Sequence, residues 1–427
     1  MNKMQFPCTF IASVVFVALS FPWVASAQER APQLLGSDRE DWPQWRGPRR
    51  DGISEETGLL SSWPADGPMR LWTASGVGRG YSSPIVVDET VYVTGDDEGD
   101  LIIRAFSIDG ELRWHAKNGA AWEKSYPGAR SACTYDHGKL YHMNAHGRLL
   151  CLDAKTGKEQ WVVNVLERFE GENITWGLSE SLLLFGDLVF ATPCGAKGLV
   201  VALNKQTGTT VWATPALEGE EPSYASPILV RIGGRILLVN SAIKNAFAVD
   251  ARTGELCWKV PQLDPKNTVS TIPVLGKNEV VLTNASRGFG GVFGVRLNGI
   301  RAARTWTKRL SISHGSTVCV DGQVYAASSR GEARGWVAVD AATGTPRIMS
   351  DLARGSLIYA DGHFYCLTER GIMTLQKAAG SRFETVGSFQ FTNGRYVWAH
   401  PVVCNGRLFL RFHETLSCYD IGQSDGC

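Results

Sequence analysis

The chain has 427 residues, 44% of them hydrophobic, and a formal net charge of +1 at pH 7. A chain of this length would hold about three ordinary domains, unless internal repeats build it into one. The near-zero charge argues against a nucleic-acid partner, because such a partner needs a basic face on the protein.

The first 27 residues have the pattern of a secretory signal peptide. Lys3 supplies a positive start, residues 10–19 form an apolar run, and Ala25-Ser26-Ala27 is a small-residue cleavage site. We therefore expect a mature chain that begins at Gln28 and is exported to the periplasm or the cell exterior. An uncleaved anchor is the alternative, but the apolar run is shorter than the ~20 residues that span a bilayer. We expect no stable membrane insertion.

Residues 28–69 lack strand periodicity and are predicted to be a polar lead followed by an irregular segment. The aromatic residues of Trp42-Pro43-Gln44-Trp45-Arg46-Gly47-Pro48 would pack this segment onto the main body. Leu71-Trp72-Thr73 is the first strand-like piece. The main body is predicted to cover residues 70–422, and residues 423–427 form a tail.

One turn recurs along the main body. In the copy at residues 151–161, Asp153 can accept hydrogen bonds from the backbone amides that follow it, and Gly157 can adopt the positive φ that closes the turn. Related phrases begin at Ala202, Ala248 and Ala338. The recurrence indicates a repeat fold. Large rings end the first five units and would wedge between neighbouring units: Trp114, Trp161, Trp212, Trp258 and Trp306.

Eight units begin with similar phrases, at residues 82, 131, 180, 226, 270, 316, 356 and 400. Each starts with a hairpin pattern, such as the one turning at Asp321-Gly322, and two more strands flank the recurring turn. This predicts an all-β fold, an eight-bladed β-propeller of four-stranded antiparallel blades. The last unit lacks a fourth strand, so the strand at residues 71–73 is expected to complete it and close the ring. Because the last three units are degenerate, seven blades is the alternative.

Most of the ten cysteines are predicted to be small buried hydrophobes. Cys8 leaves with the signal peptide. Cys133 and Cys151, like Cys404 and Cys418, would lie on the first and third strands of one unit. Those strands are about twice the 4.8 Å strand spacing apart, which is too far for a disulfide.

The Ala-x-Asp-x-x-Thr-Gly-x-x-x-Trp phrases resemble the repeat of the pyrroloquinoline-quinone-type propeller superfamily, over about residues 70–421. This superfamily contains quinoprotein alcohol dehydrogenases and a propeller subunit that helps insert outer-membrane proteins. The resemblance implies the fold, whereas a structural turn does not fix an activity. Unit five departs from the pattern at Arg296-Leu297-Asn298-Gly299, and units seven and eight also depart from it.

The long loops predict the face that carries function. Turns between first and second strands, and between third and fourth strands, are short and lie on one face. Second-to-third turns and connections between blades are long and lie on the opposite face, called here the loop face, where binding is expected. The residues just before each first strand should ring the axis on that face: Arg130, Trp176, Glu180, Tyr224, Asn267, His314, Trp398 and His400.

This ring could hold a planar, anionic ligand through Arg pairing and aromatic stacking. Alternatively, its polar groups bond to the channel backbone and water while its aromatic rings cover the core. The resemblance to quinoprotein dehydrogenases implies pyrroloquinoline quinone with calcium as the cofactor, and Glu180 is the candidate oxygen ligand. Those enzymes also have an adjacent Cys-Cys disulfide and a catalytic Asp, and this sequence has no adjacent cysteines. No catalytic residue and no metal site is assigned.

The sequence therefore predicts an exported, monomeric, non-catalytic propeller that binds a protein or peptide partner, or a small ligand, on its loop face. The alternative hypothesis is a quinone-dependent oxidoreductase that acts on alcohols or sugars.

Overall fold

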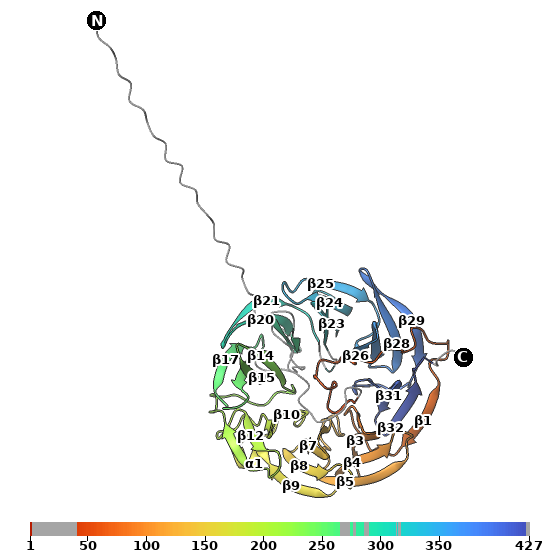
Figure 1. Cartoon of the computed structure of the whole chain (residues 1–427), viewed down its shortest axis with the longest axis horizontal. Coiled ribbons are helices and arrows are strands. Elements are labelled where there is room, and N and C mark those ends of the chain that lie inside the picture. Colours follow the sequence, from red (N-terminus) through yellow and green to blue (C-terminus); the bar gives the residue numbers. More distant parts are fainter. Residues whose placement is uncertain are drawn as a thin grey trace.

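The computed structural model describes Met1 and residues 41–264, 274–275, 279–285, 290–312, 314 and 317–423. Its strands form eight four-stranded antiparallel sheets, arranged as blades around a central axis (Figure 1). The predicted eight-bladed β-propeller is confirmed, and the seven-bladed alternative is wrong. The predicted signal peptide and Asn267 lie outside the described residues.

Blades 1 to 4 follow one another in chain order, each with its first strand nearest the axis. Their strands are β2 (Ile85–Val87), β3 (Thr90–Asp97), β4 (Asp100–Ser107) and β5 (Leu112–Ala120); β6 (Thr134–Asp136), β7 (Lys139–Met143), β8 (Arg148–Asp153) and β9 (Glu159–Asn164); β10 (Leu183–Phe185), β11 (Leu188–Ala191), β12 (Val201–Asn204) and β13 (Thr210–Ala213); and β14 (Ile228–Ile232), β15 (Arg235–Ser241), β16 (Asn245–Asp250) and β17 (Leu256–Pro261). One short helix, α1 (Val165–Phe169), follows β9.

Blades 5 to 8 continue around the ring. Their strands are β18 (Val274–Leu275), β19 (Glu279–Asn284), β20 (Gly291–Asn298) and β21 (Arg301–Lys308); β22 (Val318–Val320), β23 (Gln323–Ser328), β24 (Gly335–Asp340) and β25 (Pro346–Ser350); β26 (Gly355–Ala360), β27 (His363–Thr368), β28 (Ile372–Ala379) and β29 (Arg382–Gln390); and β30 (Val402–Cys404), β31 (Arg407–Phe412), β32 (Thr415–Asp420) and β1 (Arg70–Ser75).

The ring closes through β1, which pairs antiparallel with β32 and supplies the outer strand of blade 8, as the sequence predicted. Thr73 lies opposite Ser417, and their hydroxyl oxygens are 2.8 Å apart. Arg411, buried in β31, donates to the carbonyl oxygens of Ser82 at 2.9 Å and Gly78 at 3.0 Å. Blade 8 is thereby bonded to the connection that leads into blade 1.

The recurring turn has the predicted bonding. The backbone N–H and the hydroxyl of Thr156 both donate to Asp153 Oδ1, at 2.9 and 2.7 Å. Gly157 has φ +71°, in the left-handed region that glycine adopts without strain. A methyl group in its place would lie 2.6 Å from Cε3 of Trp114, which comes from the preceding blade.

The same pairing of a Trp with the turn glycine of the next blade repeats around much of the ring. Trp72 of β1 packs on Gly110 and donates its indole N–H to Ile108 O at 2.8 Å, so it is a sixth member of the Trp series. The other pairs are Trp161 with Gly208, Trp212 with Gly254, and Trp306 with Gly344. The glycine therefore provides both the turn and the space for the neighbour's ring.

The residues 41–60, called here the N-terminal segment, cross the centre of the ring, where they appear as the red-brown coil in Figure 1. Asp41 and Leu59 bond to Asp88 and Asp361, in turns between first and second strands, so the segment lies on the short-turn face. Backbone hydrogen bonds join it to blades 1, 2, 7 and 8: Trp42 to Val86, Pro43 to Tyr135, Ser54 to Tyr359, and Leu60 to Ile421.

The core lies between the blades, where apolar residues of adjacent sheets interlock. No disulfide joins any two of the eight cysteines that the structure describes, and six of the eight are buried, in agreement with their predicted role as small hydrophobes. Among the described residues, no helix has the length and apolar character needed to cross a bilayer.

Candidate functional site

Connections between blades bring seven aromatic side chains together on the loop face. We call them the loop-face cluster: Tyr81, Tyr126, Trp176, Tyr224, His314, Tyr396 and Trp398.

Tyr126, from the connection between β5 and β6, is the centre of this cluster. Its ring centroid lies 5.2 Å from that of Trp398, 5.7 Å from that of Tyr396 and 6.5 Å from that of Trp176. The Trp176 centroid in turn lies 5.4 Å from that of Tyr224. Such distances are typical of tilted and edge-to-face pairs. Rings from four separate connections therefore support one another.

The two histidines of the predicted ring differ in burial: His314 lies at the surface and His400 in the interior. The ring of His314 stacks on that of Trp398, with centroids 4.2 Å apart and an angle of 21°. His400 is buried and donates from Nε2 to His314 O at 3.1 Å. Burial lowers the pKa of His400 to about 3, so its imidazole is neutral. His314 therefore belongs to the loop-face cluster, whereas His400 belongs to the interior.

Arg130 lies beside the cluster and is half-buried. Its Nη2 donates to Tyr126 O at 2.6 Å, and its guanidinium carbon lies 5.3 Å from the Trp122 ring centroid. Burial lowers the pKa of Arg130 to about 10, and the attraction of Asp96 opposes this shift, so the side chain is charged at neutral pH. Asp96 Oδ2 also accepts from Trp122 N at 2.9 Å. These contacts fix the loop that carries Tyr126.

Glu180 is buried at the start of blade 3, and its carboxyl group is occupied by hydrogen bonds within the protein. Its two oxygens accept from the backbone N–H of Thr192 at 2.9 Å and from the Thr192 hydroxyl at 3.0 Å. Asn240 Nδ2 donates to the same hydroxyl at 3.0 Å. Burial raises the pKa of Glu180 to about 7, against the effects of the Thr192 bonds and of Arg50. The Thr192 hydroxyl, which donates to Glu180, thus joins blades 3 and 4.

The N-terminal segment brings buried guanidinium groups to the axis. Arg50 donates to the carbonyl oxygens of Leu182 at 2.9 Å and Ser181 at 2.8 Å, in blade 3. Arg46 donates to the carbonyl oxygens of Asp51, at 2.8 Å, and of Thr317, which leads into blade 6.

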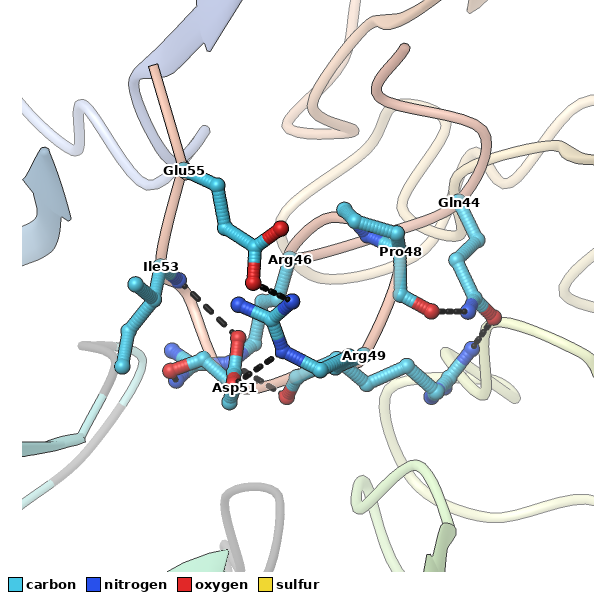
Figure 2. A network of polar contacts seen from close by, with 8 residues as sticks. Gln44, Arg46, Pro48, Arg49, Asp51, Ile53 and Glu55 are labelled. Atoms are coloured by element: carbon cyan, nitrogen blue, oxygen red, sulfur yellow. Dashed lines mark hydrogen bonds and ion pairs between the residues drawn. The ribbon is translucent and has the colours of Figure 1, made fainter. Parts of the chain in front are cut away.

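The rest of the segment is held by polar contacts of its own, which Figure 2 shows. Arg49 lies between Asp51 and Glu55, with Nε 3.1 Å from Asp51 Oδ2 and Nη1 2.5 Å from Glu55 Oε1. The Gln44 side-chain amide donates to Pro48 O at 3.0 Å.

Glu180 is not available as the oxygen ligand of a calcium-bound quinone. Glu180, the predicted oxygen ligand, already bonds to Thr192 through both oxygens and lies near the Arg50 guanidinium, which would repel a cation. Across the described ranges, no group of three or more His, Cys, Asp or Glu side chains is arranged to hold a metal ion. The arrangement can instead present aromatic rings and one guanidinium to a partner.

Seven of the eight predicted ring residues are described. The structure brings together five of them, namely Arg130, Trp176, Tyr224, His314 and Trp398, and turns Glu180 and His400 into the interior. Sequence reasoning missed Tyr81, Tyr126 and Tyr396. Tyr81 lies four residues before β2, the spacing that Arg130 has from β6, so the same rule applied to the first blade would have found it. Tyr126 and Tyr396 lie earlier in their long connections. Their aromatic character within long loops was the available signal.

Comparison with protein families gives a match to the family model described as outer membrane protein assembly factor BamB, over residues 53–174 and 99–347. The assembly factor BamB of Shewanella oneidensis is 23% identical over 232 residues, which is 54% of this chain and 55% of that protein. A crystal structure of BamB from Moraxella catarrhalis has a TM-score of 0.59 at 14% identity and covers 84% of this chain and 99% of that one, which shows a shared fold.

The quinoprotein ethanol dehydrogenase of Pseudomonas aeruginosa is 30% identical over 157 residues, which is 33% of this chain. The match covers only 25% of that dehydrogenase. The similarity therefore concerns a set of blades, not the whole enzyme.

Proposed function

This chain belongs to the pyrroloquinoline-quinone-like β-propeller family whose model is described as outer membrane protein assembly factor BamB, and from this premise we propose that it is an exported, non-catalytic binding module. It binds a protein or peptide partner through the loop-face cluster and Arg130. Its export follows from the signal-peptide pattern of residues 1–27.

The composition and exposure of the loop-face cluster carry this proposal. Tyr126 and Tyr396 are 40% and 45% exposed, although their rings pack together at the centre of the cluster. Tyr, Trp and Arg are the residues most enriched among those that dominate binding energy at protein interfaces. Rings held in place by their neighbours also lose little conformational freedom when a partner binds.

Both carboxyl oxygens of Glu180 accept hydrogen bonds from Thr192, which supports a binding module over a dehydrogenase. A catalyst that depends on a calcium-bound quinone needs free carboxylate and amide oxygens around the metal. The segment that is 30% identical to the quinoprotein ethanol dehydrogenase favours a quinone-dependent oxidoreductase as the second candidate.

Reconstitution of the purified protein separates the two candidates. We expect no change in the quinone absorption spectrum at micromolar pyrroloquinoline quinone with calcium, and no reduction of a dye by alcohols or sugars. A bound quinone together with alcohol-dependent dye reduction would overturn the binding-module proposal.

Site-specific crosslinking tests the binding face directly. A photoreactive amino acid at position 126 or 396 should give adducts of one common mass in intact cells of the native organism. The matched control is position 112, because Leu112 is 53% exposed but lies in β5, on the outer edge of blade 1. Equal labelling at all three positions, or none, contradicts a partner at the loop face.

A further inference from the structure

Several buried polar atoms near the axis lack a hydrogen-bond partner in the part of the chain that the structure describes. They belong to side chains that are almost fully buried, and they lie on the N-terminal segment and on the residues that lead into blades 6 and 8: Arg46 Nη1, Arg50 Nε, Thr317 Oγ1 and His400 Nδ1. Buried polar groups without partners are costly, and each calls for an explanation.

Arg46 is the most informative of these residues. It is 1% exposed, and its Nε and Nη2 donate to carbonyl oxygens of Arg50, Asp51 and Thr317. Nη1 remains without a partner. The hydroxyl of Thr317, whose carbonyl oxygen binds this guanidinium, also lacks one. Arg46 Nη1 and the Thr317 hydroxyl, both without a partner, therefore belong to two residues that are already in contact.

Two buried guanidinium groups of this region interact electrostatically. Arg46 and Arg50 are each at most 2% exposed, and each raises the electrostatic cost of the other. Asp51, which attracts Arg46, is shared with Arg49 through a 3.1 Å ion pair. Glu180 is the buried carboxyl group near Arg50, and burial raises its pKa to about 7, which disfavours its charged form. Buried charges are normally paired.

His400 contacts both the N-terminal segment and a residue of the loop-face cluster. Its ring lies 5.1 Å from that of Trp45, in the N-terminal segment, and its Nε2 donates to the carbonyl oxygen of His314, whose ring belongs to the loop-face cluster. His400 thus lies between the N-terminal segment on one side and the loop-face cluster on the other.

We propose that the interior of the propeller, between the N-terminal segment and the loop-face cluster, binds a small oxyanion through Arg46 Nη1 and the Thr317 hydroxyl, with Arg50 as a second positive charge. The ligand class is inorganic phosphate, sulfate or a small carboxylate, because all three accept hydrogen bonds from a guanidinium group. A metal cation is disfavoured by the two guanidinium groups. This site is separate from the partner-binding face, so either proposal can fail without the other.

Thermal unfolding at constant ionic strength tests the site. Phosphate, sulfate and acetate are each titrated into the full mature protein in chloride buffer, at low millimolar concentrations that limit general salt effects. At least one of them should raise the Tm with a saturable dependence. For a domain of this size, an anion at 100-fold excess over its Kd should raise the Tm by about 3–4 °C. Absence of any saturable rise in the wild-type protein overturns the proposal.

Arg49 provides a matched control, because it lies in the same segment and carries the same charge but is paired with Asp51 and Glu55. Arg46→Gln should abolish the anion-dependent rise in Tm, whereas Arg49→Gln should keep it. An equal anion response in the two variants contradicts the assignment of the site.

A second variant keeps the site testable if Arg46→Gln does not fold. Thr317→Val replaces the hydroxyl with a methyl group of similar size and should weaken anion binding at least tenfold in calorimetric titrations. Crystals soaked in selenate should then show an anomalous peak beside Arg46 in the wild-type protein. Unchanged affinity in Thr317→Val, or selenate located elsewhere only, would argue against this site.

Discussion

At the scale of single residues, Gly208 serves two purposes at once. Its φ is +69°, which favours glycine, and a methyl group on it would lie 2.7 Å from Cε3 of Trp161. We expect Gly208→Ala to lower the free energy of unfolding by about 2–4 kcal/mol, because the backbone strain and the overpacking against the indole ring add together. Urea unfolding monitored by circular dichroism measures this change.

Gly186 is the control for the backbone contribution alone. Its φ is +57°, but a methyl group on it would have no atom within 4 Å. Gly186→Ala should therefore cost about 1–2 kcal/mol. Equal losses in the two variants would show that the Trp161 contact contributes nothing to stability.

Glu180 predicts a pH dependence of stability. Burial raises the pKa of its carboxyl group from 4.5 to about 7 in the folded protein. Between these values the native state keeps a proton that the unfolded state releases, so this group makes the protein less stable as the pH rises. Glu180→Gln preserves the shape and can still accept from Thr192 N–H. It should match the wild type at pH 4.5 and exceed it in Tm at pH 8.

Parallel melting curves of the wild type and Glu180→Gln from pH 4.5 to pH 8 check this sign. The difference between the curves isolates Glu180 from other groups such as Asp96, whose pKa burial raises to about 6. A difference in Tm that stays constant over the whole range would mean that the pKa of Glu180 is not raised.

At the scale of the element, β1 controls ring closure. Trp72 in this strand packs on Gly110 of blade 1 and donates to Ile108 O at 2.8 Å, while the backbone of β1 pairs with β32. Trp72→Ala should lower the free energy of unfolding by about 3 kcal/mol, because a large ring is lost from the contact between blades 8 and 1. Urea titration gives the loss, and size-exclusion chromatography detects self-association through a loosened strand edge.

The adjacent Leu71 is the matched control. It lies in the same strand but is 39% exposed. Leu71→Ala should cost less than about 1 kcal/mol and leave the elution volume unchanged. If the two variants are equally stable, Trp72 has no special part in closing the ring.

The blades were predictable because their signals are local. The Asp153–Thr156 bonds and the positive φ of Gly157 follow from residues three and four positions apart, so the turn can be read from a short phrase. The closing role of β1 followed from counting strands. Trp72 was not recognised as a member of the Trp series, because its partner Gly110 lies in a unit whose turn lacks the repeated spelling.

At the scale of the whole molecule, the candidate site was less predictable than the fold. Residues that directly precede first strands were expected to face a ligand, yet Glu180 turns towards Thr192 and His400 towards His314. The sequence also did not predict that the N-terminal segment occupies the axis, where Arg46 bonds to Thr317 across 271 residues. No local pattern in the sequence reports such a contact.

The described cysteines contribute no disulfide to the stability of the closed ring. Cys404 lies in β30 and Cys418 in β32, the first and third strands of blade 8, about twice the strand spacing apart. This exceeds the reach of a disulfide, and no disulfide joins any two of the eight described cysteines. Stability must then come from ring closure and packing between blades.

We therefore expect the Tm of the purified, air-exposed protein to be the same, within about 1 °C, with and without a reducing agent. Thiol titration in denaturant, without prior reduction, should detect every cysteine of the mature chain, whereas the six buried thiols should react slowly in the native protein. A fall of several degrees on reduction, or missing thiols in denaturant, would reveal a stabilising disulfide. Non-covalent contacts alone would then not account for the stability of the ring.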